Sequence, residues 1–509
     1  MNLSQKVAFN TAVLLASRVV VAASGLAGVA VSTRYLGPAD FGQLTVAIVL
    51  VSVFGFFTDA GLYTVAAREL AKRPDEEHRI LANVFAMGLL MSAAALASAL
   101  LVTFLAYGGS GDSLVRIGVL ILAVQMLVSA VGGTASAYLI AHQRAVPTAL
   151  AATASSVIFL GLLFLTIHFD LGFAGLAACF AVSGLVTLLL PVLALRGVRL
   201  GLQRDPALWR QMLAWAVPQA GVLVLGVIYF RLDTFLLSFL SSAGEVGRYG
   251  VAYRVLEVLT VAPIYLMSTL FPEIARQQPH SARLNEIVQG AFSSVALAAV
   301  PVVIVFAIFA EEIVAVAGGP EYLDAAPVVQ FLVAAVALLF VNTVFFQSLV
   351  ALNRQGKLFV LLMAVLVVNV GLNFALIPPL GATGAALSLV ISEGAALALA
   401  LLVFREVGEV PRLRRPLRLL GATALTAGIV LLLREMLPID RPDAGLGASF
   451  TAALGPLATL VAASGITAGL WAGSLLLLDA VPAEVRAGLA ALRHRSSQEP
   501  VAVPPPVGG

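Results

Sequence analysis

Apolar runs of about 20 residues recur along almost the whole chain, separated by short charged or Gly- and Pro-containing turns. A helix of this length crosses the hydrocarbon core of a bilayer, which is roughly 30 Å thick. Of the 509 residues, 60% are hydrophobic and only 11% are charged, which leaves too little polar surface to cover a water-soluble globule. The sequence therefore predicts an all-α polytopic membrane protein.

Fourteen of these runs are predicted as transmembrane helices. Their approximate limits are 10 to 33, 41 to 64, 80 to 107, 114 to 140, 148 to 168, 173 to 195, 212 to 240, 249 to 271, 288 to 310, 326 to 352, 358 to 377, 384 to 404, 416 to 435 and 450 to 478. The first run is not expected to be a cleaved signal peptide, because Arg18 interrupts it and it continues to Ser32.

The positions of Lys and Arg predict the orientation of the chain. If the N-terminus is cytoplasmic, the inside segments hold 22 of the 30 Lys and Arg residues, and the outside loops with their helix ends hold five. Because positively charged loops stay in the cytoplasm, we expect both termini there. Basic loops beside an anionic leaflet also explain the net charge of +3 without a nucleic-acid partner.

Two weak internal repeats predict a duplicated architecture. A-H-Q-R at 141–144 matches A-L-N-R at 351–354, and L-G-F-A-G-L-A-A from Leu171 matches L-G-A-T-G-A-A-L from Leu380. A unit of six spans returns the chain to the same side, so we expect two pseudo-symmetric six-helix lobes related by an axis along the membrane normal. A cleft between such lobes can open to either side in turn, which is alternating access.

The predicted spans and lobes divide the chain into four parts. They are an N-terminal lobe at 1–195, a C-terminal lobe at 196–405, two additional transmembrane helices at 406–480, and a disordered cytoplasmic tail at 481–509.

Ionisable side chains inside the predicted spans are the candidate substrate-binding or coupling residues, because charges at membrane depth usually face an interior or a water-filled cavity. They are Arg18, Asp59, Arg231, Asp233, Arg254, Glu257 and Glu393. A structural role is the alternative to substrate binding or coupling: these groups would then form ion pairs that hold helices together. Three cations against four anions do not make a uniformly basic cleft.

Helical phase separates these candidates further. Arg231 and Asp233 are two residues apart and project roughly 200° apart, so each needs another partner, and we expect Asp233 to pair with Arg254. Arg254 and Glu257, three residues apart, share a face. Glu393 is a candidate protonated acid or proton-coupling group.

The sequence does not favour an enzyme. The longest external loops have about fifteen residues, and the sequence has no metal-ligand spacing, nucleophile motif or phosphate-binding glycine loop. Cys179 is the sole cysteine and lies in an apolar run, which predicts a packed, inert thiol.

Several motifs point to a family. R-Y-L-G-P-A-D-F-G from Arg34, D-A-G-L from Asp59 and A-R-E-L-A from Ala67, with R-L-D-T-F-L-L-S-F-L, E-V-G-R-Y-G-V-A-Y-R-V-L-E and A-L-N-R-Q-G-K further on, resemble the polysaccharide or oligosaccharide flippases of bacterial envelopes. The resemblance covers roughly residues 8–405. It implies membership of the multidrug/oligosaccharidyl-lipid/polysaccharide exporter superfamily.

The resemblance implies a V-shaped bundle in the bacterial cytoplasmic membrane that turns an oligosaccharide on undecaprenyl diphosphate to the outer leaflet, for surface polysaccharide export. It implies membrane lipids, a polysaccharide polymerase and glycosyltransferases as partners, and no cofactor, with proton or sodium coupling left open. The alternatives are an ion-coupled multidrug or peptidoglycan-precursor exporter of the same superfamily and, from another class, a membrane-embedded glycan polymerase or ligase.

Overall fold

The computed structural model describes residues 3–109, 113–144, 146–195, 200–413, 416–436, 449–482 and 485–486. All regular secondary structure in these residues is helical. The α-helices are α1 Leu3–Phe56, α2 Leu62–Lys72, α3 Glu77–Ala106, α4 Ser113–Leu122, α5 Val124–Ala141, α6 Val146–His168, α7 Gly172–Leu189, α8 Pro206–Leu240, α9 Ala243–Leu259, α10 Val261–Ala275, α11 Ala282–Ile308, α12 Ala310–Ala317, α13 Ala326–Ala351, α14 Gln355–Phe404, α15 Pro416–Met436 and α16 Ser449–Leu477. Short 3-10 helices are η1 Pro74–Glu76, η3 Leu190–Ala194 and η4 Pro320–Ala325.

The polytopic all-α prediction is confirmed, with helix at every predicted span. Ten helices among the described residues are long and apolar enough to cross a membrane, so the number fourteen itself stays a prediction. Two predicted spans are each divided, the fourth into α4 and α5 and the eighth into α9 and α10. The end of the second span is a turn that leads into the separate helix α2.

Two long helices each extend over a pair of predicted spans, although the second span continues past the end of α1. α14 has 50 residues, or about 75 Å at 1.5 Å per residue, which is more than twice the hydrocarbon thickness. Its kink lies at Gly381 (φ 56°, ψ −133°), just after Pro378 and Pro379. α1 is kinked in the same way at Gly37 (φ 72°, ψ 174°), before Pro38. Positive φ favours glycine at both kinks, and each reverses the chain between two antiparallel spans.

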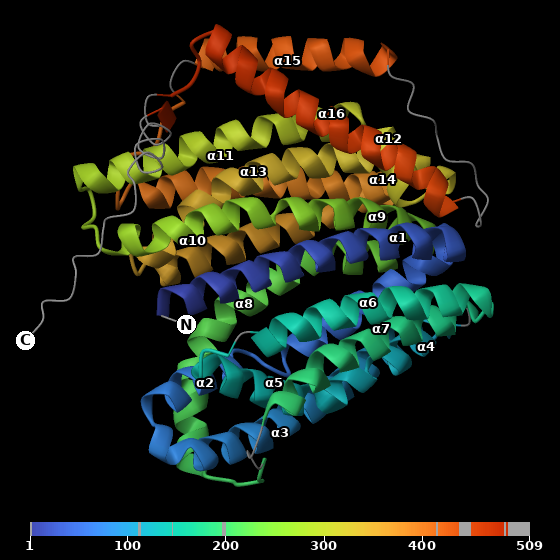
Figure 1. Cartoon of the computed structure of the whole chain (residues 1–509), viewed down its shortest axis with the longest axis vertical. Helices are drawn as coiled ribbons and strands as arrows, with labels where there is room; N and C mark the ends of the chain where they lie inside the picture. The colour runs from blue at the N-terminus through green and yellow to red at the C-terminus, as the bar shows by residue number, and fades with distance from the viewer. Residues whose placement is uncertain are drawn as a thin grey trace, which may run out of the picture.

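The helices form two groups with α1 between them (Figure 1). We call α2–α7 the first group and α8–α14 the second group. α1 packs against α6 of the first group and against α9 of the second. The predicted boundaries at residues 195 and 405 stay a prediction. α8 contacts both groups, because it packs on α14 for much of its length and on α2 near its start.

The last two helices lie outside the second group in Figure 1. α16 packs on α11, and Trp471 Nε1 donates a hydrogen bond to the Leu297 carbonyl at 3.0 Å. Arg434 of α15 pairs with the buried Glu312 of α12 at 2.8 Å. Many large apolar side chains elsewhere, such as Leu105 and Leu417, are exposed. An apolar exterior of this kind is what a lipid-facing surface requires.

Candidate functional site

Three of the predicted ionisable residues meet where α8 and α9 lie side by side. Arg231 of α8 pairs with Glu257 of α9 at 2.9 Å, and Arg254 of α9 pairs with the other oxygen of the same carboxylate at 2.8 Å. We call these three residues the arginine cluster. It carries one excess positive charge, and its side chains are 24 to 35% exposed. The cluster is therefore shielded but still reachable.

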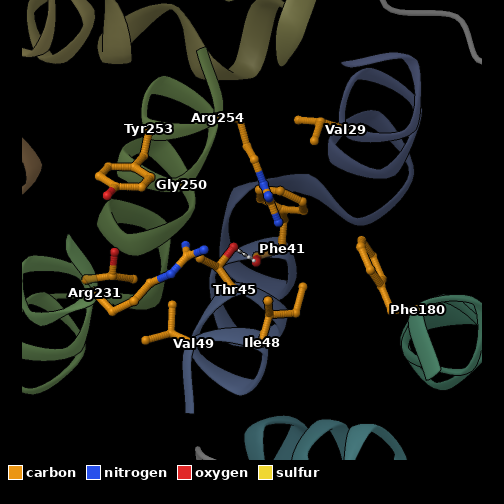
Figure 2. A pocket seen from close by; sticks show the side chains of 11 residues that line it. Val29, Phe41, Thr45, Ile48, Val49, Phe180, Arg231, Gly250, Tyr253 and Arg254 are labelled. Atoms are coloured by element: carbon orange, nitrogen blue, oxygen red, sulfur yellow. Dashed lines mark hydrogen bonds between the residues drawn. The ribbon is translucent and has the colours of Figure 1, made fainter. Parts of the chain in front are cut away.

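The arginine cluster faces α1 and the first helix group across a narrow space. Figure 2 shows Arg231 and Arg254 pointing into it beside Phe41 and Thr45 of α1, with Phe180 of α7 on the other side. Its volume is about 20 Å³, which is room for roughly one water molecule. The conformation described thus brings the two groups close together at this point.

A second, larger cavity of about 460 Å³ lies next to this space. Ile48 and Phe180 line both, so the two are neighbours. Its walls are formed by α1, α5, α6 and α7, with Leu122 at the end of α4 and Thr58 in the turn after α1. The polar residues that line it are Ser52, Thr58, Gln125, Ser129, Ser155 and Ser183. We call it the hydroxyl cavity.

Asp233 does not pair with Arg254, so that prediction is wrong. Asp233 is 1% exposed, and it accepts hydrogen bonds from Asn373 Nδ2 at 2.7 Å and from the Tyr249 hydroxyl at 3.1 Å. The residues Arg254 and Asp233 lie on opposite sides of this region, because the arginine faces the narrow space while the carboxylate points into the core of the second group. Helical phase correctly separated Arg231 from Asp233 but did not identify the partners.

Glu393 of α14 is also buried, at 3% exposed, among neutral groups. It accepts hydrogen bonds from the Tyr229 hydroxyl at 2.9 Å and from Asn342 Nδ2 at 2.7 Å. Among the described residues, neither Glu393 nor Asp233 takes part in an ion pair. Nearby, Asn342 Oδ1, Asn373 Oδ1 and Ser392 Oγ are buried without a hydrogen-bond partner, as is the amide nitrogen Nδ2 of Asn369. The second group thus contains an oxygen-rich buried network around two carboxyl groups.

The remaining two candidates lie elsewhere. Asp59 is in the turn after α1 and accepts a hydrogen bond from the backbone N–H of Tyr63 at 3.1 Å. This contact stabilises the start of α2, as side-chain oxygens commonly do at helix N-termini. Arg18 lies in α1, and its side chain is outside the part of the structure that is described.

A contact missed by the sequence reasoning joins α1 to the second group at the end that carries the Gly37 kink. Arg34 donates hydrogen bonds through Nη2 to the carbonyls of Ala315 at 2.7 Å and Val316 at 3.0 Å, at the C-terminus of α12. A guanidinium suits these carbonyls, because the last C=O groups of a helix have no partner inside it. Arg34 opens the R-Y-L-G-P motif, and nothing in that motif identified α12 as its partner.

Close backbone packing of α1 on α9 closes the same end. A Cβ atom on Gly42 would lie 1.8 Å from the Ala243 carbonyl oxygen, and one on Gly247 would lie 2.1 Å from that of Pro38. Only glycine permits such an approach. α1 is therefore in direct contact with the second group at this end.

At the other end, the start of α8 is fastened to the first group. Asn83 of α3 accepts hydrogen bonds through Oδ1 from the Asp205 N–H at 2.7 Å and from Trp209 Nε1 at 3.0 Å. Arg79 pairs with the Asp205 carboxylate, and the Arg68 guanidinium lies 5.2 Å from the ring centroid of Trp215. α8 consequently links the two groups.

Known sequences similar to this chain include one protein family and two individual relatives. The sequence model of a family described as "Polysaccharide biosynthesis protein" matches residues 7–278. Two relatives come from Haloferax volcanii. One, a "Probable low-salt glycan biosynthesis flippase", is 25% identical over 33% of this chain and 36% of its own length. The other, a "Probable flippase", is 25% identical over 42% of this chain and 46% of its own. The chain thus matches less than half of the length of each relative.

Comparison with solved structures shows the fold. A lipid II flippase MurJ in an inward closed conformation superposes with a TM-score of 0.69 at 14% identity, covering 89% of this chain and 98% of that one. An inward-facing multidrug transporter of the MATE family gives a TM-score of 0.62 at 16% identity, covering 76% and 93%. Both therefore share the fold of this chain.

Proposed function

Because the chain belongs to the family of polysaccharide biosynthesis proteins, we propose that it is a flippase for a polyprenyl-diphosphate-linked oligosaccharide. It is a transporter rather than an enzyme, in line with the flippase and transporter names of its relatives. The lipid-linked sugar would cross from the inner to the outer leaflet of a bacterial cytoplasmic membrane for surface polysaccharide export. In this proposal undecaprenyl diphosphate is the carrier and both termini are cytoplasmic.

The observation that carries the proposal is the arginine cluster facing α1 across the narrow space. A flippase must shield a diphosphate at membrane depth while the polyprenyl tail stays in lipid. Two guanidinium groups suit this task, because their charge is permanent and their planar fork binds phosphate oxygens through two parallel hydrogen bonds. Glu257 holds both guanidinium groups in place, and the excess charge of the cluster has the sign that a diphosphate needs.

Alternating access accounts for the contacts at the closed end. Rocking of the two groups would break the hydrogen bonds of Arg34 to α12 and separate α1 from α9 at Gly42 and Gly247. All of these are short-range contacts that can re-form without unfolding a helix. α8, fastened at its start to α3, would stay attached to the first group while its later part moves with α14.

We also propose that the buried network around Asp233 and Glu393 binds the coupling ion, a proton or Na⁺. An isolated buried carboxylate is strongly disfavoured unless it is neutralised. Both carboxyl groups have neutral partners. The unpartnered oxygens of Asn342, Asn373 and Ser392 could act as ligands, because a hard cation such as Na⁺ prefers oxygen ligands. Glu393→Gln and Asp233→Asn should abolish the dependence of transport on a proton or sodium gradient.

The test of flipping uses the full chain in proteoliposomes with a fluorescent short-chain polyprenyl diphosphate disaccharide, and a membrane-impermeant quencher reports the leaflet. Arg254→Gln and Arg231→Gln should each slow flipping by about tenfold or more, because each loses a charged bidentate contact. Arg283→Gln is the matched control, since Arg283 forms a similar pair with Glu286 on an exposed surface. Normal flipping by both cluster variants would contradict the proposal.

A further inference from the structure

We propose that the hydroxyl cavity binds the sugar portion of the cargo and selects sugars that carry no negative charge. This inference rests on the proposed function, in which the arginine cluster takes the diphosphate. It adds a second subsite and a substrate class: neutral, hydroxyl-rich sugars are accepted, and those bearing a carboxylate or phosphate are disfavoured.

Each hydroxyl group that lines the cavity already donates its proton in a hydrogen bond within the protein. Ser52, Ser155 and Ser183 donate to the backbone carbonyls of Ile48, Ser183 and Phe180 at 2.7 to 2.9 Å. Thr58 and Ser129 likewise donate to the carbonyls of residues three positions earlier. A hydroxyl has one proton and two lone pairs, so what these side chains still offer is mainly acceptor oxygens.

Gln125 extends this pattern. Its Nε2 donates one of its two protons to the Phe180 carbonyl at 3.2 Å, which leaves the two lone pairs of Oε1 and a single N–H. That oxygen lies against Gly184, where a Cβ atom would be 2.0 Å from it. Glycine at position 184 therefore lets the amide lie flat across α7 at the cavity wall.

Acceptor oxygens discriminate between kinds of ligand. A neutral sugar carries many O–H donors and can satisfy them on this wall. A carboxylate or phosphate has only acceptors, and it would be stripped of water beside oxygens that repel it. None of the residues that line the hydroxyl cavity in the described structure is Lys, Arg or His, so no cation in its wall would offset that loss.

The two subsites lie in the order that such a cargo requires. Ile48 and Phe180 border both the narrow space at the arginine cluster and the hydroxyl cavity. A diphosphate held by Arg231 and Arg254 would place the first sugars past these two side chains. The cavity, at about 460 Å³, is within the range of roughly 300–1,000 Å³ that small-molecule sites occupy.

The experiment measures dissociation constants of the full chain in nanodiscs for three farnesyl diphosphate probes. One has no sugar, the second carries a neutral dihexoside, and the third carries the same disaccharide with a uronic acid as its outer sugar. We expect the neutral dihexoside to tighten binding by about tenfold over the bare probe, and the uronic acid to remove most of that gain.

Two substitutions test the wall itself. Gln125→Leu should reduce the advantage of the neutral probe over the bare probe to less than about threefold, and Gln125→Lys should reverse the preference in favour of the uronic acid. The ratio between two probes on one variant is insensitive to a loss of folded protein. Gln330→Leu is the control, because Gln330 also donates to a backbone carbonyl, that of Ala307, but lies outside the cavity.

The outcomes separate the two proposals. If the bare probe does not bind, the proposed function fails at the arginine cluster. If it binds but both disaccharide probes bind equally well, the diphosphate site stands and the selective sugar subsite is overturned. An unchanged probe ratio in Gln125→Lys would also overturn it.

Discussion

Arg231 and Arg254 both pair with the carboxylate of Glu257, so this one side chain sets the charge presented to the narrow space. Sequence spacing predicted that Arg254 and Glu257 share a face, and the structure confirms it. The contribution of Arg231 depends on how α8 is rotated against α9, which residue spacing along either helix does not reveal.

Glu257→Gln should strengthen diphosphate binding. It raises the charge of the cluster by one unit while keeping a side chain of the same shape, so the dissociation constant for farnesyl diphosphate should fall by roughly three- to tenfold. Flipping should slow at the same time, because a more tightly held ligand leaves later. Glu286→Gln is the control at an exposed pair. Unchanged or weaker binding by well-folded Glu257→Gln would show that the carboxylate does not compete with the cargo.

Asp205 joins the two helix groups and supports a prediction on pH. Its pKa is held below the ordinary value of 3.8, first by the hydrogen bond from Arg79 and then by that from the Leu208 backbone N–H. A lowered folded-state pKa means that the stabilisation is fully present above pH 3.8 and is lost as the pH falls through the folded-state pKa. Solvent screening keeps the effect small at this exposed site.

Asp205→Asn should therefore lower the Tm more at pH 7 than at pH 3, because part of the stabilisation is lost once the pH lies below 3.8. Asparagine keeps the N-cap of α8 through its single oxygen, but it replaces the oxygen that pairs with Arg79 by an NH₂ group and removes the charge. Thermal unfolding of the purified chain in detergent at the two pH values checks this. A Tm difference that is equally large at pH 3 would mean that the cap, not the ion pair, was disturbed.

At the scale of helices, the limits of the predicted spans anticipated the two reversals, because Gly37 falls between the first and second spans and Gly381 between the eleventh and twelfth. Gly37 and Gly381 stand at the reversals of α1 and α14, and the Pro residues beside them prevent a continuous helix. The packing of α1 on α9 was not predicted. In a sequence, a glycine that allows two helices to cross closely cannot be told from a glycine that has no such role.

Gly247→Ala should hold the two groups apart at the Gly37 end. The new methyl group would meet the Pro38 carbonyl oxygen at 2.1 Å, so α1 and α9 must separate and the chain should shift toward the outward-open state. The measurement is labelling of a cysteine at Ile48 by an impermeant maleimide from outside, after Cys179→Ala. Its rate should rise by about tenfold, which corresponds to about 1.4 kcal/mol.

Gly226→Ala is the matched control for this substitution. It also lies in a helix of the second group, and no atom lies within 4 Å of the position that its Cβ would take. If Gly226→Ala raises the labelling of Ile48→Cys as much as Gly247→Ala does, the close crossing is not what keeps this end closed.

At the scale of the whole molecule, the prediction concerns topology. Ion pairs join neighbouring basic segments, as Arg79 with Asp205 and Lys357 with Glu406 do, whereas Gly319 lies beside Arg34 at the end that carries the Gly37 kink. In a chain without Cys179, a cysteine at Gly319 should react with an impermeant reagent applied outside intact cells, and cysteines at Lys72 and Arg204 should not. Reaction at Arg204 from outside would overturn the orientation.

The sequence by itself determined the class of fold and the places where function could lie. Hydropathy is a property of each short segment, so spans, turns and charges at membrane depth can be read without knowing their neighbours. The motifs likewise identified the family, which the family match confirms. Asp233 and Glu393 were recognisable as unusual because a buried acid is rare in any apolar run.

Only the tertiary structure decided which of these groups meet. Asp233 binds Asn373, 140 positions away, and Arg34 binds Ala315, 281 positions away. Such contacts depend on how each helix is rotated and which helices lie beside it. An apolar run is compatible with several such arrangements, so the sequence alone does not select one. The acceptor character of the hydroxyl cavity was hidden for the same reason, since the free lone pairs of a serine are known only once its proton has a partner.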